Sequence, residues 1–562
     1  MNRQNTVKII SLIIIMCILF ATITGCKENT PTTQLGTSSA TDTSSADNSS
    51  EDTSSDEVQS EDTSSEEDIS NNLEDDDDLD LNLDLDFSID LTISQTVTFD
   101  KKVQDNFAGL CGVFPCYWFL PDSTMDEPYS EKDLEISIKK LMQMGMSKVR
   151  CLNFEPAYAW DSVNDKWDWD SECMKGFYKY CDLMKENGIE IILNTAEGHT
   201  NGTSKISTEN PIPIVSAREQ ITPQQAYGAW VVEFVKEVVI KRGYDNIKYW
   251  EEATEPNNSS TSREKFDTWA GWMKAGVDAL RTAGFGSVFK HIGPSAAFRP
   301  DLDGNEKNIQ WIIWATQELN DYIDIYACHT YVWTDTCTDD YYSYWEEFTE
   351  SARKYIEPTG KLFWCDEYNV ARSGGTLEDK TAVKKDPLHA SQVALAQISL
   401  MLNNVNCSML WYPVEIKFPN TLITEGEFFE GIHKAGLDRS VIDSLIPYNG
   451  YYTYTLLGSV IQEGDTVYAG SDDMNGLHTI LLKHKNGKYS IIAINMSWTP
   501  IEATFELPNI GKSIFTKAYY DPSTFKASAK ATPIAPSSEI SASSNQFVDT
   551  VNAYNVVVYN QK

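Results

Sequence analysis

The sequence is short of positive charge: its 562 residues include 45 lysines and arginines, 83 aspartates and glutamates, and only 7 histidines. The net charge is −38, so we expect no basic surface for a nucleic-acid partner. Half of that charge lies in residues 27–86, which hold 20 acidic residues and one basic residue, Lys27. This segment is rich in Ser and Thr and lacks aromatics. It cannot bury a core and is expected to be a disordered, self-repelling tether.

Cysteine pairs at metal-binding or redox spacing are also missing. Eleven cysteines are present without a Cys-x-x-Cys motif, and several lie in apolar runs, namely Cys151, Cys328, Cys365 and Cys407. Buried free thiols are therefore expected, and a pairing of Cys111 with Cys116 stays open. Histidines and aspartates do not cluster as metal ligands, and no Gly-rich phosphate loop follows a strand. We expect neither a metal nor a cofactor.

The N-terminus has the pattern of an export signal. Arg3 and Lys8 precede an apolar run over residues 9–20, which leads to Ile-Thr-Gly-Cys at 23–26. That ending resembles a bacterial lipobox, in which Cys26 becomes the lipidated first residue; an uncleaved anchor or a plain signal peptide is the alternative. We expect residues 1–26 to be a lipoprotein signal peptide and the protein to be anchored at Cys26 to the membrane, on the bacterial cell surface.

Beyond residue 105, short β-rich runs alternate with helical patterns. Two of the helices carry start signals, one at Ser130 with Asp133 and one at Thr222 with Gln225. The β-rich runs occupy residues 108–114, 147–153, 189–195, 246–253, 287–293, 323–329, 361–367 and 406–412. Eight strands, each followed by a helix, predict an α/β fold, a (β/α)8 TIM barrel over residues 105–459. A doubly wound open sheet is the alternative, with fewer strands and a phosphate loop.

The C-terminal part changes character. Residues 460–562 contain several strand patterns, two of them joined by an Asn486-Gly487 turn, and predict an all-β sandwich. Residues 87–104 are also strand-like and precede the barrel. We expect this segment to join the C-terminal sheet.

Active sites of such barrels lie at the carboxyl ends of the strands. The expected strand ends offer carboxylates, a histidine, hydroxyls and aromatic side chains: Trp118, Asn153, Thr254, Glu255, His329, Tyr331, Glu367 and Trp411. On a strand, Glu251 and Glu255 share the inner face, whereas Glu252 points outward. Glu251 is expected to be an interior hydrogen-bonded group and Glu252 a structural one.

Two stretches carry a family resemblance, YWEEATEPN at 249–257 and FWCDEYN at 363–369. They resemble the motifs of the clan A retaining glycoside hydrolases, and a β-sandwich after the barrel is nearest in layout to family 39. The resemblance implies that Glu255 is the acid/base, Glu367 the nucleophile, and Arg150 the cation that keeps the nucleophile ionised. Thr254 departs from the pattern, because the clan has an asparagine there that binds the sugar 2-hydroxyl.

The resemblance implies hydrolysis of a β-linked polysaccharide or oligosaccharide by double displacement. Arg150, Asn153, Thr254, His329, Tyr331, Trp411 and Trp118 would then contact the substrate. In this chemistry we expect a neighbouring negative charge to raise the pKa of the acid/base. The alternative is a catalytically weak glycan-binding surface lipoprotein on the same fold. A metal-dependent hydrolase is disfavoured by the scatter of its ligand residues.

Overall fold

A computed structural model of the protein describes residues 92–116, 130–195, 210–257, 262–299, 306–333, 341–371, 383–414, 416–417, 424–425, 429–430, 446–471, 475–527 and 531–562. The expected signal peptide, Cys26 and the acidic tether lie outside the described residues. Within the described part of the chain, no helix combines the length and the apolar character needed to cross a bilayer.

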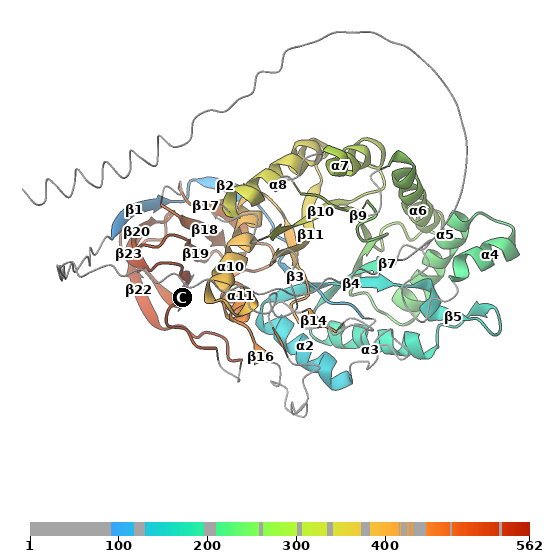
Figure 1. Ribbon diagram of the computed structural model, residues 1–562, viewed down its shortest axis with the longest axis horizontal. Coiled ribbons are helices and arrows are strands. Elements are labelled where there is room, and N and C mark those ends of the chain that lie inside the picture. The colour runs from blue at the N-terminus through green and yellow to red at the C-terminus, as the bar shows by residue number, and fades with distance from the viewer. Residues whose placement is uncertain are drawn as a thin grey trace, which may run out of the picture. The chain divides into compact units, whose positions relative to one another are not determined.

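Eight parallel strands close into a barrel (Figure 1). Its strands are β3 (Leu110–Val113), β4 (Met146–Phe154), β7 (Glu190–Thr195), β8 (Ile247–Glu251), β9 (Lys290–Ala297), β10 (Ile325–Trp333), β11 (Leu362–Ala371) and β12 (Cys407–Leu410). They follow one another around the ring in chain order, and Ser408 of β12 pairs with Leu110 of β3 to close it. Every expected run contributes one strand, so the (β/α)8 prediction is confirmed.

Helices surround the strands and cover their outer faces (Figure 1). They are α2 (Glu131–Gln143), α3 (Glu172–Glu186), α4 (Pro211–Glu219), α5 (Pro223–Phe234), α6 (Arg263–Thr282), α7 (Glu306–Glu318), α8 (Tyr341–Ile356), α10 (Pro387–Leu402) and α11 (Asn449–Val460). Both expected start signals are capping boxes: Ser130 with Asp133 begins α2, and Thr222 with Gln225 begins α5.

The barrel strands are apolar in continuous runs, without alternation. On β7 the neighbours Ile191, Ile192 and Leu193 point to opposite faces, yet all three are fully buried. Barrel strands bury both faces because side chains fill the interior and helices cover the outside. Polar side chains on these strands therefore stand out, and they gather towards the carboxyl ends.

Antiparallel sheets follow the barrel. A seven-stranded sheet has the order β2-β17-β18-β19-β24-β21-β22, and a three-stranded sheet has the order β1-β20-β23. Their strands are β1 (Ile93–Thr98), β2 (Lys101–Gln104), β17 (Thr466–Ala469), β18 (Leu477–Lys483), β19 (Tyr489–Asn495), β20 (Ile501–Glu506), β21 (Ser513–Tyr520), β22 (Ser538–Ala542), β23 (Gln546–Val551) and β24 (Val556–Gln561). Gly487, at φ 82°, makes the turn between β18 and β19.

Residues of the two sheets bury a common apolar core that includes Val97, Leu481, Phe505, Phe547 and Tyr559. The strands that precede the barrel belong to these sheets: β1 pairs in parallel with β20, and β2 pairs antiparallel with β17 (Figure 1). The described chain thus contributes two strands to the sandwich before the barrel begins, and the other strands of the sandwich follow the barrel.

Short elements complete the structure. A 3₁₀ turn, η2 (Pro156–Ala159), precedes the two-residue strands β5 (Trp160–Asp161) and β6 (Lys166–Trp167). The π-helical η3 (Val235–Lys241) continues α5, η4 (Glu357–Thr359) follows α8, and four further two-residue strands are β13 (Ile416–Lys417), β14 (Thr424–Glu425), β15 (Phe429–Glu430) and β16 (Ile446–Pro447). All eight cysteines that the structure describes, Cys111 and Cys116 among them, are free.

Candidate active site

Arg150 on β4 lies at the centre of a polar cluster inside the barrel. It is fully buried, and its Nε and Nη2 donate to the two carboxylate oxygens of Glu251 on β8, at 2.7 and 3.0 Å. Nη2 also donates to the hydroxyls of Thr254 and Ser295, at 3.1 and 3.0 Å. Burial alone would lower the pKa of Arg150, but Glu251, Asp366 and Glu367 outweigh it and raise the pKa. Arg150 is therefore a fixed positive charge.

Glu367 on β11 is held by two donors. Arg150 Nη1 donates to its Oε1 at 2.6 Å, and the Tyr331 hydroxyl on β10 donates to its Oε2, also at 2.6 Å. Each oxygen of the Glu367 carboxylate therefore accepts one hydrogen bond from within the protein, and the two bonds fix its orientation.

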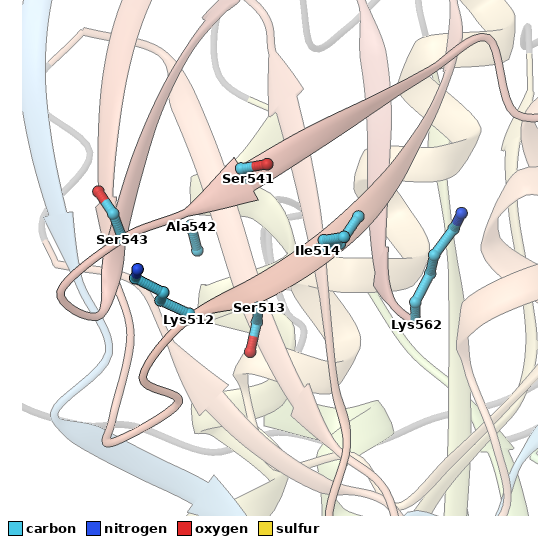
Figure 2. A pocket seen from close by; sticks show the side chains of 7 residues that line it. All are labelled: Lys512, Ser513, Ile514, Ser541, Ala542, Ser543 and Lys562. Atoms are coloured by element: carbon cyan, nitrogen blue, oxygen red, sulfur yellow. The ribbon is translucent and has the colours of Figure 1, made fainter.

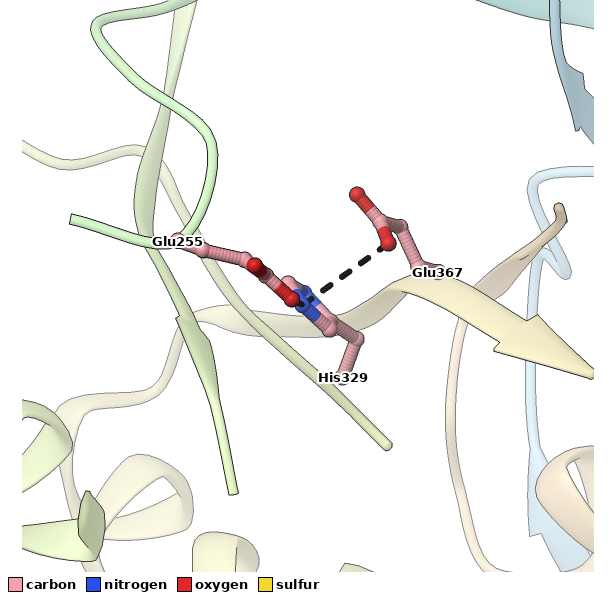
Figure 3. Close-up of side chains that lie close together, drawn as sticks. All are labelled: Glu255, His329 and Glu367. Atoms are coloured by element: carbon pink, nitrogen blue, oxygen red, sulfur yellow. Dashed lines mark hydrogen bonds and ion pairs between the residues drawn. The ribbon is translucent and has the colours of Figure 1, made fainter. Parts of the chain in front are cut away.

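His329 on β10 stands between Glu255 and Glu367 (Figure 3). Its Nε2 is 3.0 Å from Glu255 Oε1 and 3.8 Å from Glu367 Oε2, while its Nδ1 is 3.0 Å from Asp366 Oδ1. Burial lowers the pKa of His329, but the charges of Glu367 and Asp366 and the hydrogen bonds outweigh burial, so its pKa is raised well above the usual range. The ring is therefore an imidazolium that donates from both nitrogens at neutral pH.

Glu255 is the most solvent-accessible carboxylate of this cluster: its side chain is 28% exposed, whereas that of Glu367 is 3% exposed. One oxygen of Glu255, one of Glu367 and a ring nitrogen of His329 all lie within 4.8 Å of one another. Two carboxylates from β11 and from the turn after β8 thus flank one small space. Glu255 is therefore the carboxylate of this pair that solvent reaches more readily.

The pKa of Glu255 runs against the expectation from sequence. Burial raises it, but the hydrogen bond and charge of His329, with help from Arg150, outweigh burial and lower the pKa below its usual value. The expectation considered only a carboxylate as neighbour, and the structure places an imidazolium at 3.0 Å instead. The two opposite pKa shifts favour the proton of the pair on His329 over Glu255.

Glu255, His329 and Glu367 are the described His, Cys, Asp or Glu groups that come close enough together to hold a metal ion. Their contacts are those of proton partners, because His329 Nε2 and Glu255 Oε1 are at hydrogen-bond distance. The raised pKa of His329 also keeps a proton on the nitrogen that a metal would need. We therefore treat the three as an acid–base cluster.

Backbone strain gathers at the same rim. Asn153, Glu255, Ser295 and Tyr412 have φ angles of 54°, 48°, 57° and 40°, in the left-handed region that non-glycine residues seldom adopt. They lie near the carboxyl ends of β4, β8, β9 and β12. Two of them are joined directly, because the Glu255 amide donates to the Ser295 carbonyl at 3.1 Å. Strained residues at one barrel end are typical of a functional site.

The turn that carries Glu255 is bracketed against β9. The Asn257 side chain donates to the Ala297 carbonyl at 2.7 Å and accepts from the Ala297 amide at 3.0 Å. The side-chain amide of Asn257 thereby bonds the backbone of β9 beyond the end of β8, in the way a further strand residue would. Together with the bond from the Glu255 amide, this fixes the direction in which the Glu255 carboxylate points.

Thr254 is engaged within the protein. Its hydroxyl accepts from Arg150 Nη2 at 3.1 Å and donates to Asn194 Oδ1 at 3.0 Å. The single hydroxyl proton is therefore used, and a sugar hydroxyl could reach only the remaining lone pair. The contact that an asparagine would make from this position must come from another group.

Asn153 and Trp411 lie at the rim as expected. The Asn153 side chain is exposed, and its backbone amide donates to Asn194 Oδ1 at 3.2 Å. Trp411 is half-buried just after β12, with its ring edge-on to Tyr331 at a centroid distance of 6.3 Å. Trp118 lies outside the described residues.

Three residues of the cluster were missed from the sequence, namely Asn194, Ser295 and Asp366. Asn194 on β7 donates to Glu251 Oε2 at 3.1 Å, and Ser295 on β9 accepts from Arg150. Asp366 precedes the nucleophile candidate and should face outward on a regular strand. A register irregularity between Cys365 and Tyr368 lets both acids face inward. The sequence signal that could have identified Asp366 is the pair of adjacent acids, Asp366 and Glu367, near the end of an expected strand.

The two glutamates before Glu255 follow the expected division. Glu251 is buried inside the barrel; burial and Asp366 raise its pKa to about 7, although Arg150 opposes the rise. Glu252 is buried on the helix side of β8, where the Tyr227 hydroxyl of α5 donates to it. Burial raises the pKa of Glu252 to about 8, so it is largely a neutral acid at pH 7.

A second hollow, of about 640 Å³, lies in the C-terminal domain between β21 and β22 (Figure 2). It is lined by Lys512, Ser513, Ile514, Ser541, Ala542, Ser543 and Lys562. These side chains include no carboxylate and no aromatic ring, and Lys562 is paired with Glu539. The lining therefore lacks a carboxylate pair.

The sequence matches no protein-family model and no curated protein. Among solved structures, a family 30 endoxylanase from Clostridium papyrosolvens C71 is similar at 13% identity and a TM-score of 0.52, over 83% of this chain and 100% of that one. A family 39 enzyme from Xanthomonas axonopodis pv. citri is similar at 12% identity and a TM-score of 0.54, over 84% of this chain and 98% of that chain.

A conserved exported protein from Bacteroides fragilis is similar at 10% identity and a TM-score of 0.57, over 83% of this chain and 100% of that chain. Identities this low establish a shared fold and leave the activity open. The expected fold, a (β/α)8 barrel with an appended β-domain, is thereby confirmed.

Proposed function

We propose that the protein is a retaining glycoside hydrolase, with Glu367 as nucleophile and Glu255 as acid/base. The observation that carries the proposal is the pair itself: carboxylate oxygens of Glu255 and Glu367 lie within 4.8 Å of each other. Retaining enzymes place their two carboxyl groups roughly 5–5.5 Å apart, whereas inverting enzymes leave about 6.5–9.5 Å for a water molecule. The spacing favours direct attack by a carboxylate.

In the first step, one Glu367 oxygen attacks the anomeric carbon while Glu255 gives its proton to the departing glycosidic oxygen. Arg150 and Tyr331 hold Glu367 so that the attacking oxygen keeps its direction. In the second step, Glu255 takes a proton from water, and the water oxygen displaces Glu367 from the anomeric carbon. The sugar is released with its original anomeric configuration, and both carboxylates return to their starting state.

The substrate class in the proposal is a β-linked polysaccharide or oligosaccharide. Trp411 and Tyr331 supply aromatic surface beside the carboxylates, and the relatives in fold include an endoxylanase and a glucosidase. Arg150, Asn153, Thr254, His329 and Trp118 complete the proposed substrate-binding group. Of these, Arg150 would act through Glu367 and Thr254 through Asn194, because their side chains are hydrogen-bonded to these residues.

The proposed organisation is a lipoprotein signal peptide at 1–26, a tether at 27–86, a strand segment at 87–104, the catalytic barrel at 105–459 and the β-sandwich at 460–562. A lipid on Cys26 would hold the barrel at the outer side of the membrane. The 20 acidic residues of this 60-residue tether would repel one another and extend the chain. The similarity in fold to an exported protein is consistent with this placement.

The test is the stereochemistry of hydrolysis. The protein carrying Cys26→Ala is incubated with a panel of xylan, mannan, glucan and exopolysaccharide fragments, and the first-formed anomer is read by NMR before mutarotation. We expect a product of retained configuration from at least one glycan. An inverted product would contradict the assignment of Glu367 as nucleophile. Tight binding without any turnover would support the alternative, a glycan-binding surface lipoprotein.

A further inference from the structure

Carboxylates contact both ring nitrogens of His329. Glu255 follows β8, and Asp366 and Glu367 lie on β11; their oxygens are 3.0, 3.0 and 3.8 Å from the ring nitrogens. The Tyr331 ring lies edge-on to the imidazole at a centroid distance of 6.5 Å, and both Tyr331 and Arg150 bind Glu367. Glu251 lies beyond them on Arg150. The nearest groups are thus all anionic, and the ring is fully buried among them.

Asp366 has no place in the two-carboxylate reaction, yet it is fully buried and costly to keep as an anion. Its Oδ1 accepts from His329 Nδ1, and its Oδ2 is 3.8 Å from Arg150 Nη2. Burial alone would raise the pKa of Asp366, but the charges of His329 and Arg150 lower it well below the usual range. A charged Asp366 fixes which way the imidazole faces.

With Nδ1 bound to Asp366, the other nitrogen of His329 can only point at Glu255. We propose, on the basis of the proposed glycosidase function, that Asp366 is a positioning residue that makes His329 the proton partner of Glu255. The Asp366–His329–Glu255 chain then stores the proton that Glu255 donates to the leaving group and takes back the proton that Glu255 draws from water.

The proton balance of this chain is simple. Before bond cleavage the proton moves from His329 Nε2 to Glu255 Oε1 along the 3.0 Å hydrogen bond, which leaves a neutral imidazole still bound at Nδ1 to Asp366. Glu255 then passes the proton to the glycosidic oxygen as the carbon–oxygen bond breaks. In the second half, Glu255 removes a proton from the attacking water and His329 recovers it.

This arrangement also explains why a carboxylic acid with a lowered pKa can serve as an acid. The pKa of Glu255 is lowered, but the 3.0 Å hydrogen bond joins it to His329, whose pKa the charges of Glu367 and Asp366 raise, so the pair shares one proton. The pH at which activity is lost on the alkaline side is therefore a property of the pair.

The test is the pH profile of an Asp366→Asn variant. The amide oxygen can still accept from Nδ1, so the geometry is kept while the charge is removed. We expect the alkaline limb of kcat/KM on a natural glycan to move to lower pH by about one to two units, the usual effect of removing one opposite charge at this range. An aryl glycoside with a good leaving group needs no proton, so its kcat/KM should change much less.

The matched control is Glu252→Gln. It makes the same change of a buried carboxyl to an amide, also next to the site, but its described contacts are with Tyr227, on the helix side of β8. The alkaline limb should stay in place in this variant. A purely structural role of Asp366 would lower activity at all pH values in parallel and leave the limb unmoved, and that result would overturn the proposal.

A second measurement does not depend on turnover. The measurement is nitrogen-15 NMR of labelled histidines in the otherwise unaltered chain, and the signal that is lost in His329→Gln identifies His329. We expect its ring to be protonated at both nitrogens well above pH 6.5. In Asp366→Asn, the midpoint of the His329 titration should move to lower pH. A His329 that titrates near its ordinary pKa would overturn the proposal even if the glycosidase is active. If His329 titrates as expected but the protein hydrolyses no glycan, the Asp366–His329 pairing is supported. In that case only the proposed glycosidase function is contradicted.

Discussion

Arg150 Nη1 donates to Glu367 Oε1 across 2.6 Å, and the two side chains are 0% and 3% exposed. A buried ion pair of this kind stabilises little by itself, because both charges had to leave water. Its consequence is geometric: the guanidinium also binds both oxygens of Glu251, so a rigid fork connects β4, β8 and β11. The Glu367 carboxylate is thereby fixed in position.

Breaking this fork should cost both folding and activity. Arg150→Met leaves Glu251 and Glu367 as buried acids without the Arg150 cation, and we expect a loss of roughly 3–5 kcal/mol of unfolding free energy. Arg150→Lys keeps one charge but cannot bind Glu251 and Glu367 in the same way, so it should fold and lose activity. Urea unfolding and kcat/KM measure the two effects. An Arg150→Met protein as stable as wild type would contradict the buried-pair argument.

The two catalytic candidates should fail differently. Glu367→Ala removes the nucleophile, and we expect a loss of ~10⁴-fold or more on every substrate because the covalent step disappears. Glu255→Ala should still react with activated aryl glycosides and then stall for lack of a base. Azide should rescue Glu255→Ala as a glycosyl azide of retained configuration, whereas Glu367→Ala would give the inverted adduct. NMR gives the anomeric configuration of each glycosyl azide. If the two variants give the opposite configurations, Glu367 is the acid/base and Glu255 the nucleophile.

Tyr331→Phe removes one hydrogen bond to the nucleophile without changing shape. The lost bond is 2.6 Å long and ends on a charged oxygen, so we expect kcat/KM to fall about 10- to 100-fold. Tyr326→Phe is the matched control on the same strand, because its hydroxyl bonds the Ala315 carbonyl and Asn320 at the helix side. If both variants lose activity equally, the effect of Tyr331 lies in the fold.

The raised pKa of Glu252 should make the free energy of unfolding depend on pH. Burial raises its pKa from 4.5 to about 8 in the folded protein, so between these values the folded state holds a proton that the unfolded state has lost. Stability should therefore fall as pH rises from about 4.5 to 8, at about 1.4 kcal/mol per pH unit from this group. Glu252→Gln should remove that contribution. Thermal unfolding of both proteins across this pH range checks it; identical slopes would refute the assignment.

The lipid anchor is tested by fractionation. Because Cys26 ends the Ile-Thr-Gly-Cys pattern, we expect the wild-type protein to leave the membrane only with detergent. Cys26→Ala should appear in the soluble fraction after export, or remain bound through an uncleaved apolar segment. In either case it should take up no label from a lipid precursor. Labelled Cys26→Ala protein would place the lipid elsewhere.

The barrel could be predicted from the sequence because each strand and helix carries its own local signal. Runs such as residues 189–195 are apolar on both faces, which suits strands covered on both sides, and Ser130 and Thr222 mark helix starts through bonds to residues three positions on. Periodicity and capping depend on neighbours along the chain. The eight strands and the candidates Glu255 and Glu367 therefore followed from the sequence.

Tertiary structure alone decided which side chains meet inside the barrel. Asp366 turns inward through an irregularity in the pairing of β11, and the imidazolium of His329 lies beside Glu255 because β10 passes between β9 and β11. The protonation of the pair follows from distances of 3.0 Å between residues far apart in the chain. The charge that one residue feels is set by such distances, and sequence order does not contain them; for this reason the residue types were predictable and the proton on His329 was not.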